Sequence, residues 1–224
     1  VVTTLAGLAG VLGSADGIGS DARFYQPWGV AVDAAGNVYV GDHLNDTIRR
    51  GELPLTLTSA VSRKVHGAAG SFDVNLPLTG EPGVECRSSG GAHTLVFTLN
   101  HSLVSGSASV TSGVGTVSGA PIFAGDTMTV SLTGVVDVQK IIVTLSGVTD
   151  TFSQVLPDTA VSVNMLIGDT TGNKSVNASD AAQTKAQSGA PVTSANFRND
   201  VNASGTINAG DVAQVKANAG HNLP

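Results

Sequence analysis

The sequence predicts a mainly β protein with a small α-helical module at its C-terminal end. Apolar residues alternate with polar ones at period two through most of the chain, and no long helical pattern interrupts them. Glycine contributes 28 of the 224 residues and charged side chains only 12%, a composition that suits β structure. Near the C-terminal end one segment occurs twice, which indicates a duplicated loop–helix unit. These observations divide the chain into residues 1–50, 51–166 and 167–224.

The duplicated segment consists of two twelve-residue stretches, 169–180 and 200–211, that begin 31 positions apart (200 − 169). Each stretch leads into a matching tail, 180–189 or 211–220, for which we expect a helix. Ca²⁺ takes about six to eight oxygen ligands, and a twelve-residue loop supplies them from alternating positions. We therefore predict two Ca²⁺ ions, one per loop. The ligands are Asp169, Thr171, Asn173, Ser175, Asn177 and Asp180 in the first loop, and Asp200, Asn202, Ser204, Thr206, Asn208 and Asp211 in the second, with Ser175 and Thr206 contributing carbonyl oxygens.

Three further features of the loops lead to expectations. Gly205 stands at the sharp turn of the second loop, where a positive φ is easiest for glycine. Lys174 takes that place in the first loop, so we expect strain and a positive charge near the ion. Val176 and Ile207 are expected to anchor the loops against each other. With two acidic ligands per loop, the dissociation constant is expected to be roughly 10⁻⁵ to 10⁻³ M.

The alternative interpretation of the polar clusters is helix capping alone, a task for which Ser179 and Asp180 suffice. A single copy favours that interpretation. Two copies in register favour calcium binding.

Residues 168–220 resemble a type I dockerin, in which Asp rather than Glu closes each of two loop–helix repeats. The resemblance implies EF-hand-like calcium loops and helices that dock onto a cohesin, an arrangement that often tethers polysaccharide-degrading enzymes to a scaffold. By position, the cohesin-reading sites correspond to Ala178, Ser179, Lys185, Ala186, Ala209, Gly210, Lys216 and Ala217.

Residues 1–50 predict β-strands over 27–33 and 38–42, and a third that begins at 45. Together with the opening segment 1–7 they resemble one NHL repeat, a four-stranded blade of a β-propeller. One blade cannot bury both of its faces, so this segment is not expected to fold cooperatively alone.

Asp33, Asp42 and His43 form a candidate site within this blade. The alternative is that these residues serve in turns and in contacts between strands.

Residues 51–166 predict an antiparallel β-sandwich, because five segments alternate with Gly-, Ser- and Pro-rich turns. The alternating positions are Phe72/Val74/Leu76, Leu95/Phe97/Leu99, Met128/Val130/Leu132, Ile141/Val143/Leu145 and Val161/Val163/Met165. The pattern resembles Ig-like modules of bacterial surface proteins. Aromatic platforms for sugar are sparse, and Phe72 and Phe97 occupy core-facing registers, so we expect a spacer or an intramolecular packing partner for the calcium module and predict no small-molecule substrate.

Charge and composition exclude several functions. The net charge of −6 argues against nucleic acids and anionic membranes, and no apolar run is long enough to span a bilayer. Cys86 is the single cysteine, so no internal disulfide can form. The chain contains no hydrolase elbow, zinc helix or paired histidines, so we expect no enzyme activity. It begins at Val1, which suggests a fragment whose export signal lies upstream.

Three functional hypotheses follow. The first is a non-catalytic, calcium-binding C-terminal region of an extracellular or cell-surface multidomain protein of bacterial type. The second is a dockerin that anchors a polysaccharide-degrading enzyme to a cohesin. The third is an upstream enzyme carried on a full propeller.

Overall fold

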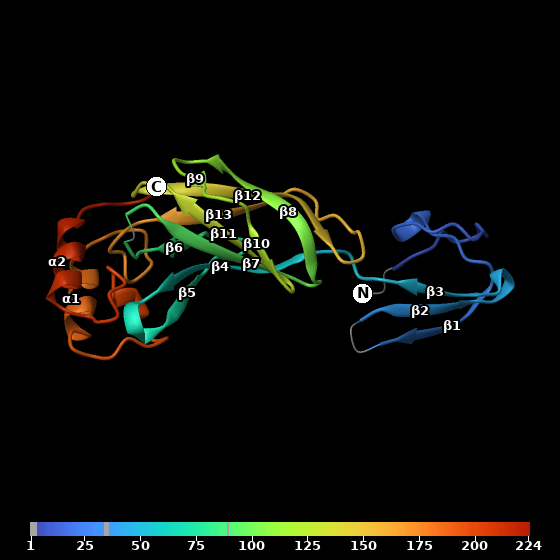
Figure 1. Ribbon diagram of the computed structural model, residues 1–224, viewed down its shortest axis with the longest axis horizontal. Coiled ribbons are helices and arrows are strands. Elements are labelled where there is room, and N and C mark those ends of the chain that lie inside the picture. The colour runs from blue at the N-terminus through green and yellow to red at the C-terminus, as the bar shows by residue number, and fades with distance from the viewer. Residues whose placement is uncertain (1–3, 34–35, 89) are drawn as a thin grey trace. The chain divides into compact units, whose positions relative to one another are not determined.

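The computed structural model describes residues 4–33, 36–88 and 90–224. The chain is mainly β with two short α-helices near its C-terminal end, and it separates into two compact units, Val1–Pro54 and Leu55–Pro224 (Figure 1). Within the described residues, no helix has the length and apolar character needed to cross a membrane.

The first unit contains a three-stranded antiparallel meander. Its elements are η1 (Gly19–Asp21), β1 (Pro27–Val32), β2 (Val38–Asp42), η2 (His43–Asn45) and β3 (Thr47–Gly51). Every residue of β1 is exposed, and Trp28 has 78% of its surface accessible to solvent. The opening segment 1–7 was part of the resemblance to a four-stranded blade; residues 4–7 form no strand, and residues 1–3 lie outside the described part of the chain.

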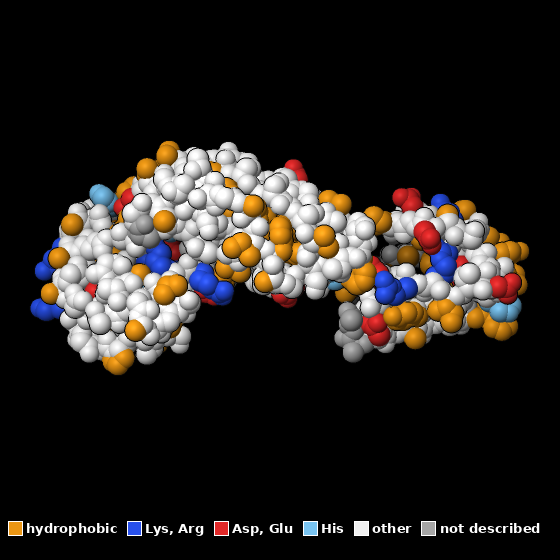
Figure 2. Space-filling view, viewed as in Figure 1, with side chains coloured by type: hydrophobic (Ala, Val, Ile, Leu, Met, Phe, Trp, Pro, Cys, Tyr) orange, Lys and Arg blue, Asp and Glu red, His pale blue; other side chains and the backbone are white. Residues whose placement is uncertain are grey.

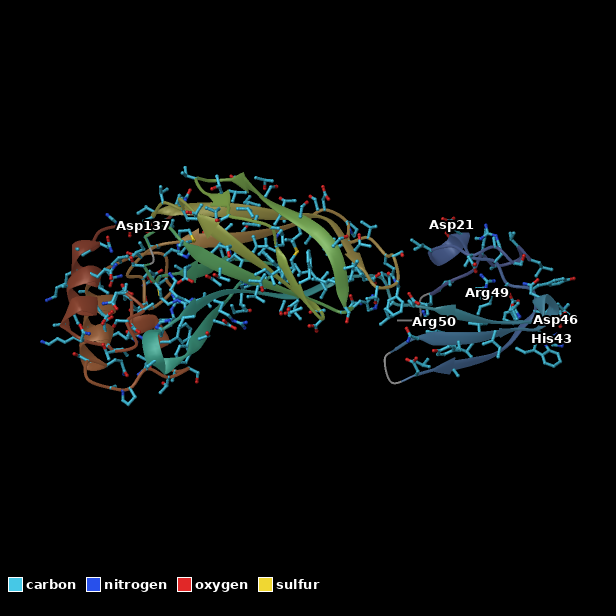
Figure 3. All side chains as sticks on the ribbon, in the orientation of Figure 1. Asp21, His43, Asp46, Arg49, Arg50 and Asp137 are labelled. Atoms are coloured by element: carbon cyan, nitrogen blue, oxygen red, sulfur yellow. The ribbon has the colours of Figure 1, made fainter. Side chains whose placement is uncertain are left out.

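Asp33, Asp42 and His43 have structural partners within this unit. Asp33 accepts hydrogen bonds from Asn37, and buried Asp42 accepts one from the Tyr25 N–H at 2.6 Å. The His43 ring stacks on Trp28 at 4.2 Å, at the turn between β2 and β3 (Figure 3).

The second unit begins with two β-sheets. One sheet has the order β10-β11-β7-β4-β5, with β9 paired to β11, and the other has the order β6-β13-β12-β8. The strands are β4 (Leu57–Val65), β5 (Ser71–Asn75), β6 (Gly83–Glu85), β7 (His93–Leu99), β8 (Leu103–Ser112), β9 (Thr116–Val117), β10 (Ile122–Ala124), β11 (Thr127–Thr133), β12 (Gln139–Asp150) and β13 (Thr159–Met165), and η3 (Gly67–Ala69) joins β4 to β5. We refer to residues 57–165 as the two-sheet module.

One hydrophobic core unites both sheets of this module. Phe97 of β7 and Met128 of β11 are fully buried, and so are Val143 of β12 and Val163 of β13. All five alternating segments form the expected strands. Because period two places every second side chain on one face, these segments bury their apolar positions together, with the exception of Phe72.

Three features of the module differ from the expectation. Strand β4 shows no apolar alternation because its buried positions include Ser62 and Lys64. Strand β6 pairs with β13 in parallel, although an antiparallel sheet was expected. Phe72 is only partly buried and stacks on Phe197, outside the module, with ring centroids 5.5 Å apart.

The C-terminal loop–helix pair contains α1 (Ala178–Ala186), η4 (Phe197–Asn199) and α2 (Ala209–Ala217). A second hydrophobic cluster joins it to the two-sheet module: Val84 of β6 and Leu166 pack with Val176, Val201 and Val215. The edge strand β6 therefore supplies part of the core of the helical pair, and only residues 166–168 separate β13 from the first loop.

Candidate metal centre

Each helix begins directly at the end of a predicted loop, and the same side chains serve both. Asn177 and Asn208 are the N-cap residues, and their side chains accept N–H groups of the first turn. In return, Asp180 and Asp211 accept the N–H groups of those caps at 2.9 Å, which completes a capping box at both helices. Ser179, which was considered as a cap, is the second residue of α1.

In the first loop, the predicted ligands Asp169, Thr171 and Asp180 come together. The carboxylate of Asp169 accepts three backbone N–H groups from the turn 172–174, at 2.8 to 3.1 Å. The hydroxyl oxygen of Thr171 lies 2.9 Å from the Asp180 carboxylate and 3.2 Å from that of Asp169. Positions 1, 3 and 12 of the loop therefore present their oxygens to one small region.

The second loop repeats this arrangement. Asp200 accepts the N–H groups of residues 204–205 at 2.9 and 2.8 Å, and Asp211 accepts the N–H of Asn202 at 3.2 Å. One partner comes from outside the loop: Nδ1 of His66 lies 2.8 Å from Oδ2 of Asp200.

The other predicted ligands occupy the rim of their loops. Each amide oxygen accepts a backbone N–H two residues ahead, as Asn173 does from Ser175 at 3.0 Å. The carbonyl oxygens at position 7 face the amide nitrogens of the cap residues, at 3.3 Å in the first loop and 3.4 Å in the second. The residues concerned are Asn173, Ser175 and Asn177 in the first loop and Asn202, Ser204, Thr206 and Asn208 in the second.

The sharp turn has the expected conformation in both loops. Gly205 has φ +90° and Lys174 has φ +69°, so the lysine adopts a left-handed conformation that favours glycine. The positive charge of Lys174 was expected near the ion. Its Nζ instead lies 2.9 Å from the carboxylate of Glu81, with which it forms an ion pair.

Val176 and Ile207 are both buried, and their backbones fasten the loops to the rest of the helical pair. Val176 exchanges backbone hydrogen bonds with Gly220 and His221, which follow α2. The carbonyl of Ile207 accepts the N–H of Gly189, which follows α1, at 2.9 Å. Each loop is thus fastened to the chain that leaves the opposite helix.

Four carboxylates dominate the electrostatics of this region. Asp169, Asp180, Asp200 and Asp211 are completely buried. Burial raises the pKa of Asp211, and the charge of Asp200 adds to the rise, whereas backbone N–H groups oppose it. Among the described residues, no Lys or Arg lies within ion-pair distance of these four carboxylates. A buried anion is costly unless a cation compensates it, so a divalent ion fits this pair of loops.

The chemistry of the donor set fits Ca²⁺ in particular. Within the part of the chain that the structure describes, no three His, Cys, Asp or Glu side chains cluster as metal ligands. The loops instead combine two carboxylates with hydroxyl, amide and carbonyl oxygens, which are the ligands of a hard cation.

All eight positions that the dockerin resemblance singles out on the helical pair are solvent-accessible. Basic side chains lie at the outer edge of the pair, beside α1 and α2 (Figure 2). The exposed positions are Ala178, Ser179, Lys185, Ala186, Ala209, Gly210, Lys216 and Ala217.

Sequence reasoning missed a polar cluster that connects the two-sheet module to the second loop. It consists of Ser62, His66, Glu85, Arg87 and Asp200. The guanidinium of Arg87 donates two hydrogen bonds to Glu85, at 2.8 and 2.7 Å, and both side chains are buried. The Arg87 charge and hydrogen bond hold the pKa of Glu85 at about 2 in spite of its burial. Ser62 and Lys64, which interrupt the apolar pattern of β4, were the sequence signal that could have indicated this polar cluster.

Two family models match separate segments of the chain. The family model of the dockerin type I domain matches residues 167–218, and that of the NHL repeat matches residues 24–49. These matches confirm the paired dockerin repeats and the single NHL repeat. No curated protein and no solved structure matches the chain.

Proposed function

We propose that this chain is a non-catalytic, calcium-binding structural and interaction region of an extracellular or cell-surface multidomain protein. The dockerin type I match supports a calcium-binding interaction module. The single observation that carries the proposal is the burial of four aspartates in two oxygen-lined loops.

Each loop holds one Ca²⁺ in this proposal. Asp169 and Asp180 bind the first ion with Thr171, and Asp200 and Asp211 bind the second. The remaining rim oxygens complete the two coordination shells. Because Asp180 and Asp211 also close the capping boxes, the bound ion fixes the first turn of α1 and α2 as well. Calcium binds the folded form, so stability rises with its concentration.

Calorimetric titration of the full chain with calcium tests this function. We expect two ions per wild-type chain and one ion after Asp169→Ala or Asp200→Ala. Asp158→Ala, an exposed carboxylate outside the loops, serves as the matched control and keeps both ions. An unchanged melting temperature between EDTA and millimolar calcium would contradict the proposal.

Docking onto a cohesin-like protein is the second candidate function, in which the chain anchors a polysaccharide-degrading enzyme to a scaffold. The exposure of all eight recognition positions favours it. A pull-down with a panel of cohesins in calcium tests the idea, with the double variant Lys185→Glu/Lys216→Glu as the comparison. We expect capture by wild type and its loss in the variant or in EDTA. Equal capture of both proteins in both buffers would refute recognition through these positions.

The other parts of the chain receive supporting roles. The two-sheet module acts as an Ig-like spacer that packs against the calcium loops. The NHL repeat acts as a propeller blade whose neighbouring blades, and any catalytic domain, belong to other parts of the parent protein. The exposed faces of β1 support the need for such neighbours. A sharp thermal transition of an isolated 1–50 peptide would argue against that role.

A further inference from the structure

We propose that His66, on the turn between β4 and β5, is a positioning residue of the second calcium loop. The inference rests on the proposed calcium binding and adds a difference between the two loops. The second ion is bound by a site that includes the two-sheet module, whereas the first ion is bound by its own loop.

The contact between His66 and the loop is direct and buried. Nδ1 of His66 lies 2.8 Å from Oδ2 of Asp200, and both side chains have no exposed surface. The sequence separation is 134 residues, so this hydrogen bond joins two distant parts of the fold. Because Asp200 is the first ligand of the second loop, the bond fixes the orientation of a metal-binding carboxylate.

Arg87 determines which nitrogen of His66 carries the proton. Nη1 of Arg87 lies 3.1 Å from Nε2 of His66, and a guanidinium can only donate. Nε2 therefore accepts and Nδ1 donates to Asp200. Arg87 itself is held by Glu85 and by the carbonyl oxygens of Ser62 and Phe72, both at 2.8 Å. The series Glu85–Arg87–His66–Asp200 thus orients a ligand through its outer partner, as second-shell groups do in metal sites.

The backbone at this junction leaves no room for a different placement. A Cβ on Gly67 would lie 2.2 Å from the carbonyl oxygen of Ser204, and one on Gly205 would lie 2.7 Å from that of His66. The N–H of Ser88 also donates to the carbonyl of Val201 at 2.6 Å. The second loop is therefore held against the module at its ligand-bearing turn.

The first loop has no counterpart of His66 among the described residues. In both loops the aspartate oxygens accept N–H groups of their own loop. The side chains that bond the carboxylates of Asp169 and Asp180 also come from the first loop, whereas Asp200 has His66 as a partner from outside its loop. This asymmetry predicts that a change at His66 affects one ion and leaves the other unchanged.

Residue-resolved calcium titration of the intact chain by NMR tests the proposal. The backbone N–H groups of Lys174 and Gly205 are matched reporters, because each donates to the first aspartate of its loop at 2.8 Å. In His66→Phe, which keeps an aromatic ring beside Phe72 and Phe197, we expect the dissociation constant at Gly205 to rise about 10- to 100-fold. The constant at Lys174 is expected to stay within about twofold.

Two isosteric variants provide a second test that does not depend on the phenylalanine variant. The change His66→Asn places an amide N–H near the site of Nδ1, toward Asp200. The change His66→Gln places the amide near the site of Nε2, where its oxygen accepts from Arg87 and no N–H reaches Asp200. We expect His66→Asn to keep most of the affinity of the second loop and His66→Gln to lose it. Equal changes at both loops, no change, or the reverse order of Asn and Gln would overturn the proposal. Absence of calcium binding at both loops of the wild type would instead refute the proposed function.

Discussion

Removal of Arg87 is expected to destabilise the second unit strongly, because it leaves a buried carboxylate without its cation. In Arg87→Met, Glu85 keeps the hydroxyl of Ser62 and the N–H of residue 87 as partners but loses both guanidinium bonds. Removing one member of a buried ion pair costs about 3 to 5 kcal/mol. The double variant Glu85→Leu/Arg87→Met removes both charges and is expected to lie between Arg87→Met and wild type.

Urea denaturation in excess calcium, followed by far-ultraviolet circular dichroism, measures this loss. Trp28 and both tyrosines, Tyr25 and Tyr39, belong to the first unit, so their fluorescence follows that unit separately and should not change. Arg63→Met is the matched control, since Arg63 makes a similar pair with Asp73 on an exposed surface and is expected to contribute about 1 kcal/mol or less. A cost for Arg87→Met no larger than for Arg63→Met would refute the reasoning.

Three further predictions concern a glycine, a histidine and the first loop. Gly67→Ala should destabilise the second unit by about 2 kcal/mol or more through the clash with Ser204, whereas Gly70→Ala, which also has positive φ but open space, should cost less in the same urea assay. Burial holds the pKa of His93 at about 4, so the unfolded chain binds the proton first and stability falls by about 3 kcal/mol between pH 6.5 and pH 4. His93→Gln should remove this part of the slope in urea titrations at both pH values, and an unchanged slope would contradict the assignment. Lys174→Gly should raise stability in calcium by about 1 kcal/mol, measured as a higher melting temperature, because glycine adopts φ +69° without strain.

The parts of the fold that local pattern determines were predictable from the sequence. The five alternating segments form strands because their apolar side chains must share one face, as Phe97 and Val163 do in the core. The paired loops were predictable because duplication repeats the same oxygen-bearing residues in register. The positive φ at Lys174 followed from its alignment with Gly205.

The contacts between modules were not predictable in this way. His66 and Asp200 lie 134 residues apart, and nothing in their local sequence links them. Strand β4 escaped detection because Ser62 and Lys64 face a polar cluster, so their burial depends on Arg87 and not on an apolar period. The ion pair of Lys174 was likewise not predictable, because its partner Glu81 is a surface residue of the two-sheet module.

Asp180 and Asp211 each have two roles, and this has a consequence for how the C-terminal helices form. Each carboxylate closes a loop and also starts a helix of nine residues, a length that is marginal for an isolated helix in water. Without a cation, repulsion between the buried carboxylates of each loop opposes both tasks together, so the proposed calcium binding predicts less helical structure in EDTA. With calcium bound as proposed, the same two side chains close the loops and start the helices together, so the calcium concentration around the chain decides whether both form.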